Sequence, residues 1–144
     1  MRRARAALRE SDFEVLDGSH AALTRDFNFT RAGEKGKVVR GGINGEVFDL
    51  LRVDARPELG STEIWEFTTD VYHPVHLHLV HFKVLSRSNR EPLPKDAGWK
   101  DTLDVPPGQI VCLLVRFDGS RGKHAFHCHN LKHEGLMMAN FEVV

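Results

Sequence analysis

Histidine, cysteine and methionine side chains gather in two short windows of the sequence. The chain of 144 residues has nine histidines, and eight of them lie between residues 73 and 81 or between residues 124 and 133. The first window reads HPVHLHLVHF and the second reads HAFHCHNLKHEGLMM. Together they offer imidazole nitrogen, thiolate sulfur and thioether sulfur, which are ligands that zinc and copper favour. This clustering indicates metal binding rather than packing.

The tripeptide around Cys128 predicts two separate metal sites. Side chains alternate between the two faces of a strand, so His127 and His129 point to one side while Cys128 points to the other. His76 and His78 share a face for the same reason. His73 lies at an odd spacing from both of them and can turn toward the side of Cys128.

The side that carries the thiolate predicts a copper site. His133 follows Cys128 by five residues, and a short loop can return it to that side. A set of Cys128, His73 and His133 with a weak axial Met is the His₂Cys arrangement of blue-copper electron-transfer sites. Met137 and Met138 both stand close enough in sequence to supply the axial thioether.

The other side carries only imidazoles. This set could bind Zn²⁺ or Cu²⁺ on ligand chemistry alone, and its four members are His76, His78, His127 and His129.

Short apolar runs separated by Gly, Pro, Asn and Asp predict an all-β domain. Many short strands at this spacing indicate a sandwich or barrel. The expected strands are DFNFTR, GKVVRGGI, EVFDLLRV, TEIWEFTT, HLHLVHFKVL, TLDV, QIVCLLVRF, KHAFHCH and MANFEVV. Residues 2–10 favour a helix with no buried face, and residues 32–36 and 86–98 are expected to be loops.

Length and charge set limits on what the protein can be. The length fits a single domain with one core, which we place at residues 24–144 after an arm or linker at residues 1–23. The formal net charge is zero, so charge favours neither nucleic acid nor an anionic membrane as a partner. We see no signal peptide or membrane span. Cys112 lies in an apolar run and is expected to be a small buried residue outside any disulfide.

The two histidine motifs resemble those of the multicopper oxidases, the family of laccases and bilirubin oxidases. The resemblance runs from about residue 24 to residue 144, through INGEVFD, LGSTEIWEF, HPVHLHLVHFKVL, GWKDTLDVPPGQ and HCHNLKHEGLMMANFEVV. The last domain of that family carries H-x-x-H-x-H and, downstream, H-C-H-x-x-x-H followed by a Met. The resemblance implies a cupredoxin-like Greek-key β-barrel or sandwich that binds copper.

The resemblance also implies a role for each matching residue. His73, Cys128 and His133 would be the equatorial ligands of a type 1 copper. His76 would be a type 2 ligand, and His78, His127 and His129 would be type 3 ligands of the trinuclear cluster that reduces oxygen. Electrons would pass from the type 1 copper through Cys128 and its neighbours to that cluster. Glu134 matches a carboxylate that donates protons in this family, which is chemically reasonable general acid work.

The sequence departs from the family pattern at the axial Met. HEGLMM is one residue shorter than the usual segment. Counting ten residues from Cys128 selects Met138, whereas keeping the last strand in register through Phe141 selects Met137. We favour Met137.

A larger departure concerns the number of histidines. The family's trinuclear cluster takes eight histidines from two cupredoxin domains, and this chain offers four. A second copy of the chain or another cupredoxin domain must then supply the rest. We expect Val80, Phe82 and Val84 to form an apolar surface beside the imidazoles that such a partner would cover.

Three functions are compatible with these motifs. The first is an oxidase domain that takes single electrons from a phenol, an amine, a bilirubin-like compound or a metal ion and reduces O₂ to water. The second is a stand-alone blue-copper electron-transfer protein, which leaves four aligned histidines without a role. The third is a copper carrier or storage module. Relatives work outside the cytoplasm, which suggests a periplasmic or secreted protein.

Overall fold

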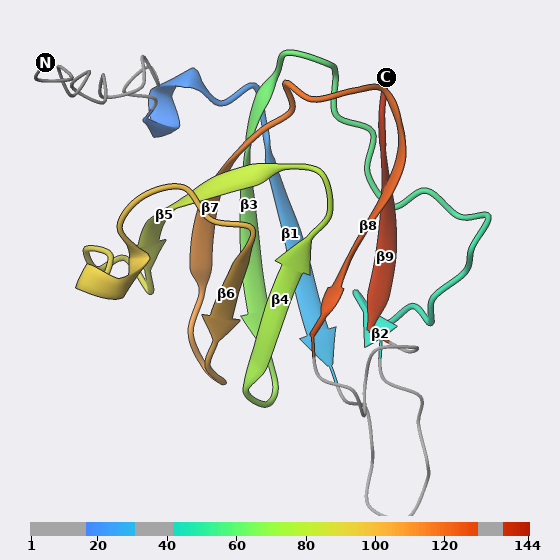
Figure 1. The fold of residues 1–144 in the computed structure, drawn as a ribbon. Helices are drawn as coiled ribbons and strands as arrows, with labels where there is room; N and C mark the ends of the chain where they lie inside the picture. The colour runs from blue at the N-terminus through green and yellow to red at the C-terminus, as the bar shows by residue number, and fades with distance from the viewer. Residues whose placement is uncertain (1–16, 31–41, 130–136) are drawn as a thin grey trace, which may run out of the picture.

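The protein folds as a sandwich of two β-sheets, which the computed structural model describes for residues 17–30, 42–129 and 137–144 (Figure 1). The five-stranded sheet has the order β2-β1-β3-β7-β5, and the four-stranded sheet has the order β6-β4-β8-β9. The first sheet contains β1 (Thr24–Thr30), β2 (Gly42–Ile43), β3 (Thr62–Thr69), β5 (His81–Arg87) and β7 (Val111–Arg116). The second contains β4 (His73–Leu77), β6 (Thr102–Val105), β8 (Gly122–Cys128) and β9 (Met138–Val143). The all-β prediction is confirmed.

Aromatic side chains fill the space between the sheets. Trp65 of β3 is fully buried, and its ring centroid lies 4.8 Å from that of Phe27 and 5.2 Å from that of Phe126. Edge-to-face contacts at such distances stabilise aromatic clusters beyond the area they bury. Phe126 lies two residues before Cys128 on β8, so the same packing fixes the strand that carries the cysteine.

The predicted strand HLHLVHFKVL is two strands in the structure. β4 ends at Leu77 in the four-stranded sheet, and β5 begins at His81 in the other sheet. Leu79 lies between them with a φ of 71°, in the left-handed region where a strand cannot continue. The predicted strands TEIWEFTT and TLDV match β3 and β6.

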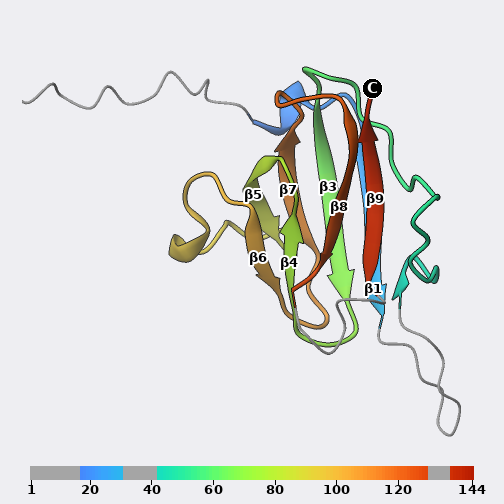
Figure 2. The same ribbon diagram turned by 45° about the vertical axis from the view of Figure 1, so that its right-hand side comes forward.

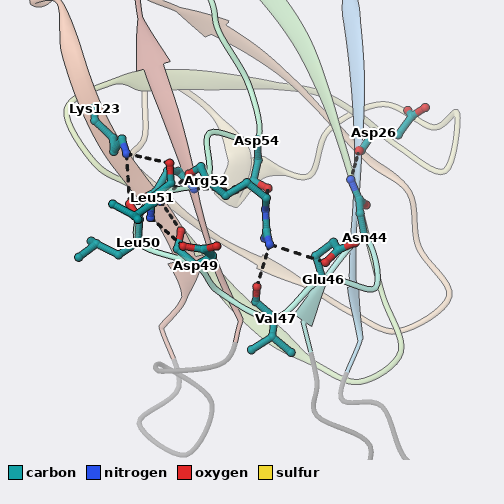
Figure 3. A network of polar contacts seen from close by, with 11 residues as sticks. Asp26, Asn44, Glu46, Val47, Asp49, Leu50, Leu51, Arg52, Asp54 and Lys123 are labelled. Carbon is teal, nitrogen blue, oxygen red and sulfur yellow. Dashed lines mark hydrogen bonds and ion pairs between the residues drawn. The ribbon is translucent and has the colours of Figure 1, made fainter.

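The predicted strand EVFDLLRV is wrong, because most of this segment is a loop. Its backbone is bound by side chains instead of a strand ladder: Arg52 donates to the carbonyl of Val47, and Lys123 donates to the carbonyls of Leu50 and Leu51 (Figure 3). The segment continues past β9, where the amide of Glu142 donates to the carbonyl of Ala55 at 2.9 Å. It therefore covers an edge of the four-stranded sheet that would otherwise be exposed. Figure 2 shows this segment beside β9.

Two expectations about apolar residues are also wrong. Val80, Phe82 and Val84 belong to the core, with exposed fractions of 3%, 0% and 6%, and form no surface beside the imidazoles. The switch of sheets after β4 turns these side chains inward. Cys112 is only half-buried, because it lies on the outer face of the five-stranded sheet beside Glu66, with Sγ 3.5 Å from Oε1.

The ends of the predicted domain are partly described. β1 starts at Thr24, and the backbone of Ala22 and Leu23 already bonds to β3. A short 3₁₀ turn, η1 (Gly18–His20), precedes it, and a second, η2 (Pro94–Asp96), lies in the predicted loop after β5. No described helix is long and apolar enough to cross a membrane. The predicted helix at residues 2–10, the loop at residues 32–36 and residues 36–41 of GKVVRGGI lie outside the described residues.

Candidate metal centre

The cysteine of the second window contacts a histidine of the first inside the core. β4 and β8 are antiparallel neighbours in which Val75 pairs with Cys128. The Nδ1 atom of His73 lies 3.1 Å from the Sγ atom of Cys128, and neither residue is exposed. A buried imidazole beside a buried thiol provides two ligands of the expected His₂Cys set.

The register of the last strand places the two methionines on opposite faces. Met138 pairs with His127 across β8 and β9, so it shares the face of that histidine and is half-buried. Met137 precedes it, is 1% exposed and belongs to the same core cluster as Cys128. The amide of Cys128 donates to the carbonyl of Met137 at 3.0 Å. Met137 is thus the methionine on the cysteine's side.

Four imidazoles gather on the outer face of the four-stranded sheet, the face turned away from the core. The Nε2 atoms of His78 and His127 are 2.9 Å apart. Ring centroids lie 4.9 Å apart for His76 and His78, 5.7 Å for His76 and His127, and 5.8 Å for His76 and His129. Strands β4 and β8 therefore bring together all four members of the predicted second set.

Two of these rings are held through their Nδ1 atoms. The Nδ1 atom of His127 lies 3.0 Å from the carbonyl oxygen of Cys128, and that of His76 lies 3.0 Å from the carbonyl oxygen of Asp101 and 2.9 Å from Oγ1 of Thr102. Hydrogen bonds of this kind orient metal-binding imidazoles and leave the other nitrogen for the metal. Sequence reasoning missed Asp101 and Thr102, although both lie in the motif GWKDTLDVPPGQ.

The electrostatics of the cluster favour neutral imidazole. Burial lowers the pKa of His78, and the nearby rings of His127 and His76 lower it further, because a positive charge would be poorly solvated and repelled. Neutral imidazole is the form that binds a metal.

The remaining predicted ligands are not all in view. His133 and Glu134 lie outside the described residues. Within residues 17–30, 42–129 and 137–144, no three His, Cys, Asp or Glu side chains form a group that could hold a metal ion. The described donors are therefore parts of two sites: a thiol–imidazole pair with a buried Met nearby, and an imidazole cluster. Both donor sets fit copper chemically.

The histidines outside the two sets lie elsewhere. His20 bonds to Asp17 at 3.1 Å, and the ring of His124 rests on Phe141 with 5.5 Å between centroids. His81 is exposed on β5. These positions agree with the ordinary roles expected for them.

Comparisons with known proteins identify the family. A multicopper oxidase family model matches residues 19–144. A laccase of Haloferax volcanii is 40% identical over 133 residues, which is 88% of this chain and 23% of the laccase. A bilirubin oxidase of Albifimbria verrucaria is 35% identical over 127 residues, which is 81% of this chain and 21% of that enzyme.

The fold agrees with that assignment. A solved laccase-like multicopper oxidase from the lignin-degrading bacterium Ochrobactrum superposes with a TM-score of 0.80 and 33% identity, covering 90% of this chain and 32% of that one. One from Aquifex aeolicus gives 0.72 and 28%, covering 89% and 30%. The chain spans less than a quarter of the length of the two curated relatives. With both histidine motifs in place on a cupredoxin-like sandwich, the chain belongs to the multicopper oxidase family.

Proposed function

We propose that this domain carries the substrate-oxidising copper site of an oxidase and about half of its oxygen-reducing cluster. The observation that carries the proposal is the arrangement around β8. Cys128 faces the core beside His73, while His127 faces outward beside His78 and His76. Two adjacent residues thus serve two sites on opposite faces of one sheet, so the covalent distance between the sites is as short as a chain allows.

The core-side site would hold type 1 copper through His73, Cys128 and His133, with Met137 as the axial ligand. When bound, copper would supply the one-electron chemistry that takes electrons from a small reducing substrate and delivers them to O₂. The chain's own contribution is burial: His73 and Cys128 have no exposed surface, so solvent does not compete for the ligand positions. Met137 is proposed instead of Met138 because it lies on the cysteine's side of the strand.

The outer face would hold part of a trinuclear cluster, with His76 as a type 2 ligand and His78, His127 and His129 as type 3 ligands. These four imidazoles share one open sheet face, and the family pattern requires eight. The other four would come from a further cupredoxin domain or a second subunit docked on this face.

Two parts of the proposed reaction rest on the family alone. Glu134 would donate protons for oxygen reduction. The reducing substrate would be a phenol, an amine, a bilirubin-like compound or a metal ion. Substrate choice depends on loops around the entry site and does not follow from the ligands.

Copper content and oxygen uptake test the proposal together. The protein is loaded with copper and separated by size, and each fraction is assayed for bound copper and for O₂ consumption with a phenolic donor. We expect an assembled fraction with about four copper ions per completed site and steady oxygen uptake. About one copper per chain in every fraction, reduced reversibly without oxygen uptake, would support the alternative of a stand-alone blue-copper electron carrier.

A further inference from the structure

The ring of His76 is hydrogen-bonded from the neighbouring strand. His76 on β4 pairs directly with Thr102 on β6, so the two side chains share a sheet face. The Nδ1 atom of His76 lies 2.9 Å from Oγ1 of Thr102 and 3.0 Å from the carbonyl oxygen of Asp101. That carbonyl also accepts from the amide of Leu77 at 3.0 Å, which fixes its position against β4.

A second contact sets the direction of the hydrogen bond from His76. The hydroxyl of Thr102 donates to Oδ1 of Asp101 at 3.0 Å. A hydroxyl has a single proton, and an ionised carboxylate can only accept. Once that proton is given to Asp101, Oγ1 of Thr102 can only accept from His76. The carbonyl of Asp101 can also only accept, so both neighbours of Nδ1 require a proton on it.

We propose that Asp101 and Thr102 are positioning residues that hold His76 in its Nδ1–H tautomer and leave the lone pair on Nε2. Neutral imidazole has one protonated nitrogen, so a proton on Nδ1 makes Nε2 the acceptor. Only the identity of the metal that this lone pair would bind rests on the proposed function. The tautomer belongs to the metal-free protein and can be measured there.

The neighbouring ring of His78 shows why such a device matters. Its Nε2 atom lies 2.9 Å from Nε2 of His127, whose Nδ1 atom lies 3.0 Å from the carbonyl of Cys128. If His127 donates to that carbonyl, its Nε2 is an acceptor and the proton between the rings belongs to His78. His78 must then lose that proton before its Nε2 can bind a metal. His76 needs no such change and offers its lone pair from the start.

Long-range ¹H–¹⁵N NMR of the full metal-free chain tests the tautomer directly. At about pH 8 the imidazoles are neutral, and the ¹⁵N shifts show which ring nitrogen carries the proton. We expect wild-type His76 to be protonated at Nδ1. Thr102→Val removes the hydroxyl while keeping a β-branched side chain, and Asp101→Asn can donate to the hydroxyl and release its proton toward His76. Both variants should show His76 protonated at Nε2 in part of the population.

The matched control is Thr102→Ser, which keeps the hydroxyl and should keep the wild-type tautomer. Copper(II) affinity provides the second measurement, made in the Cys128→Ser background so that the core-side site does not contribute. Loss of an outer hydrogen bond to a metal-binding histidine typically weakens binding at least about tenfold, and we expect this for Thr102→Val.

Two results would overturn the proposal. One is a wild-type His76 protonated at Nε2. The other is a folded Thr102→Val protein with an unchanged tautomer. If the tautomer shifts as expected but the assembled protein consumes no oxygen, the positioning role stands and the oxidase function fails. The two failures are therefore distinguishable.

Discussion

Cys128 is the residue on which both proposed sites depend. Its thiol lies 3.1 Å from His73 in the core, and its backbone carbonyl lies 3.0 Å from the Nδ1 atom of His127 on the other face. Alternation along a strand made this division predictable from the tripeptide HCH. The supporting pair Asp101 and Thr102 was not predictable in the same way, because its contact with His76 depends on which strand lies beside β4.

Replacing Cys128 should remove the blue colour of the copper-loaded protein. Charge transfer from thiolate to Cu(II) requires the sulfur to be bound to the metal, so Cys128→Ser should abolish the intense visible band. Cys112→Ser is the control, because Cys112 lies in the other sheet beside Glu66 and should not affect the colour. Visible absorption spectra of the two variants decide the matter. An unchanged band in Cys128→Ser would end the type 1 assignment.

The axial ligand can be tested by the two adjacent methionines. Met137→Leu should raise the reduction potential of the type 1 copper, because losing a weak axial thioether favours Cu(I). Met138→Leu should leave the potential unchanged, because Met138 pairs with His127 on the opposite face. Redox titration of the visible band measures both. A shift confined to Met138→Leu would show that loop length, rather than strand register, selects the ligand.

At the scale of elements, a buried ion pair holds the connection between the two sheets. Arg87 at the end of β5 donates to Asp96 in η2 through two nitrogens, at 2.8 Å and 2.9 Å, and to the carbonyl of Asp104 on β6 at 3.0 Å. Asp96 also accepts from the amide of Leu93 at 2.9 Å. The loop after β5 is thereby attached to β6, which in turn carries Thr102 against His76.

This ion pair predicts a pH-dependent contribution to stability. The hydrogen bond from Arg87 lowers the pKa of Asp96 below its ordinary 3.8 in the folded protein. Its stabilisation is therefore full above that ordinary value and is lost as the pH falls through the lowered folded value. Asp96→Asn should reduce the free energy of unfolding by about 3 kcal/mol at pH 7, because it leaves a buried guanidinium poorly paired.

Chemical denaturation at several pH values checks this prediction. The difference between wild type and Asp96→Asn should shrink below about pH 4, where Asp96 becomes protonated in the unfolded chain. Asp118→Asn is the matched control, since the exposed pair of Arg116 and Asp118 should contribute no more than about 0.5 kcal/mol. A constant difference from pH 7 to pH 3 would contradict the assignment.

Strand patterns explain which elements could be predicted. TEIWEFTT alternates buried and half-buried residues between turn residues, and the structure has β3 over the same residues. EVFDLLRV has strand-like composition, but its backbone is satisfied by Lys123 and Asn140, which lie 70 to 90 residues away. Such distant partners leave no local signal. The break at Leu79 was also hidden, because the residues on both sides of it favour strands.

At the scale of the whole molecule, the imidazole face is continuous with an exposed pair of leucines. Asn140 pairs with Ala125, two residues before His127, so all three side chains share the outer sheet face. Asn140 donates to the carbonyls of Asp49, Leu50 and Arg52. With the carbonyls bound inward, the side chains of Leu50 and Leu51 stay 69% and 84% exposed. Strand spacing puts this loop on the order of 10 Å from His127.

These leucines replace Val80, Phe82 and Val84 as the apolar part of the docking surface. If a domain or subunit completes the imidazole cluster, it covers the outer face of the four-stranded sheet and meets the rim formed by Leu50 and Leu51. Exposed leucines on a well-ordered loop cost little entropy to bury, so they suit an interface anchor. We expect the double variant Leu50→Ser, Leu51→Ser to weaken assembly about tenfold and to lower oxygen uptake in proportion.

Size fractionation with copper and oxygen assays on each fraction measures this effect. The blue band should persist in the double variant, because His73 and Cys128 are buried on the other side of the sheet. Leu93→Ser is the control: Leu93 is 47% exposed but lies in the loop after β5, so assembly should be unchanged. A monomeric fraction that consumes oxygen as fast as the assembled one would refute the requirement for a partner. An assembly that persists in the double variant would place the partner elsewhere, because an interface across the imidazole face cannot avoid this loop.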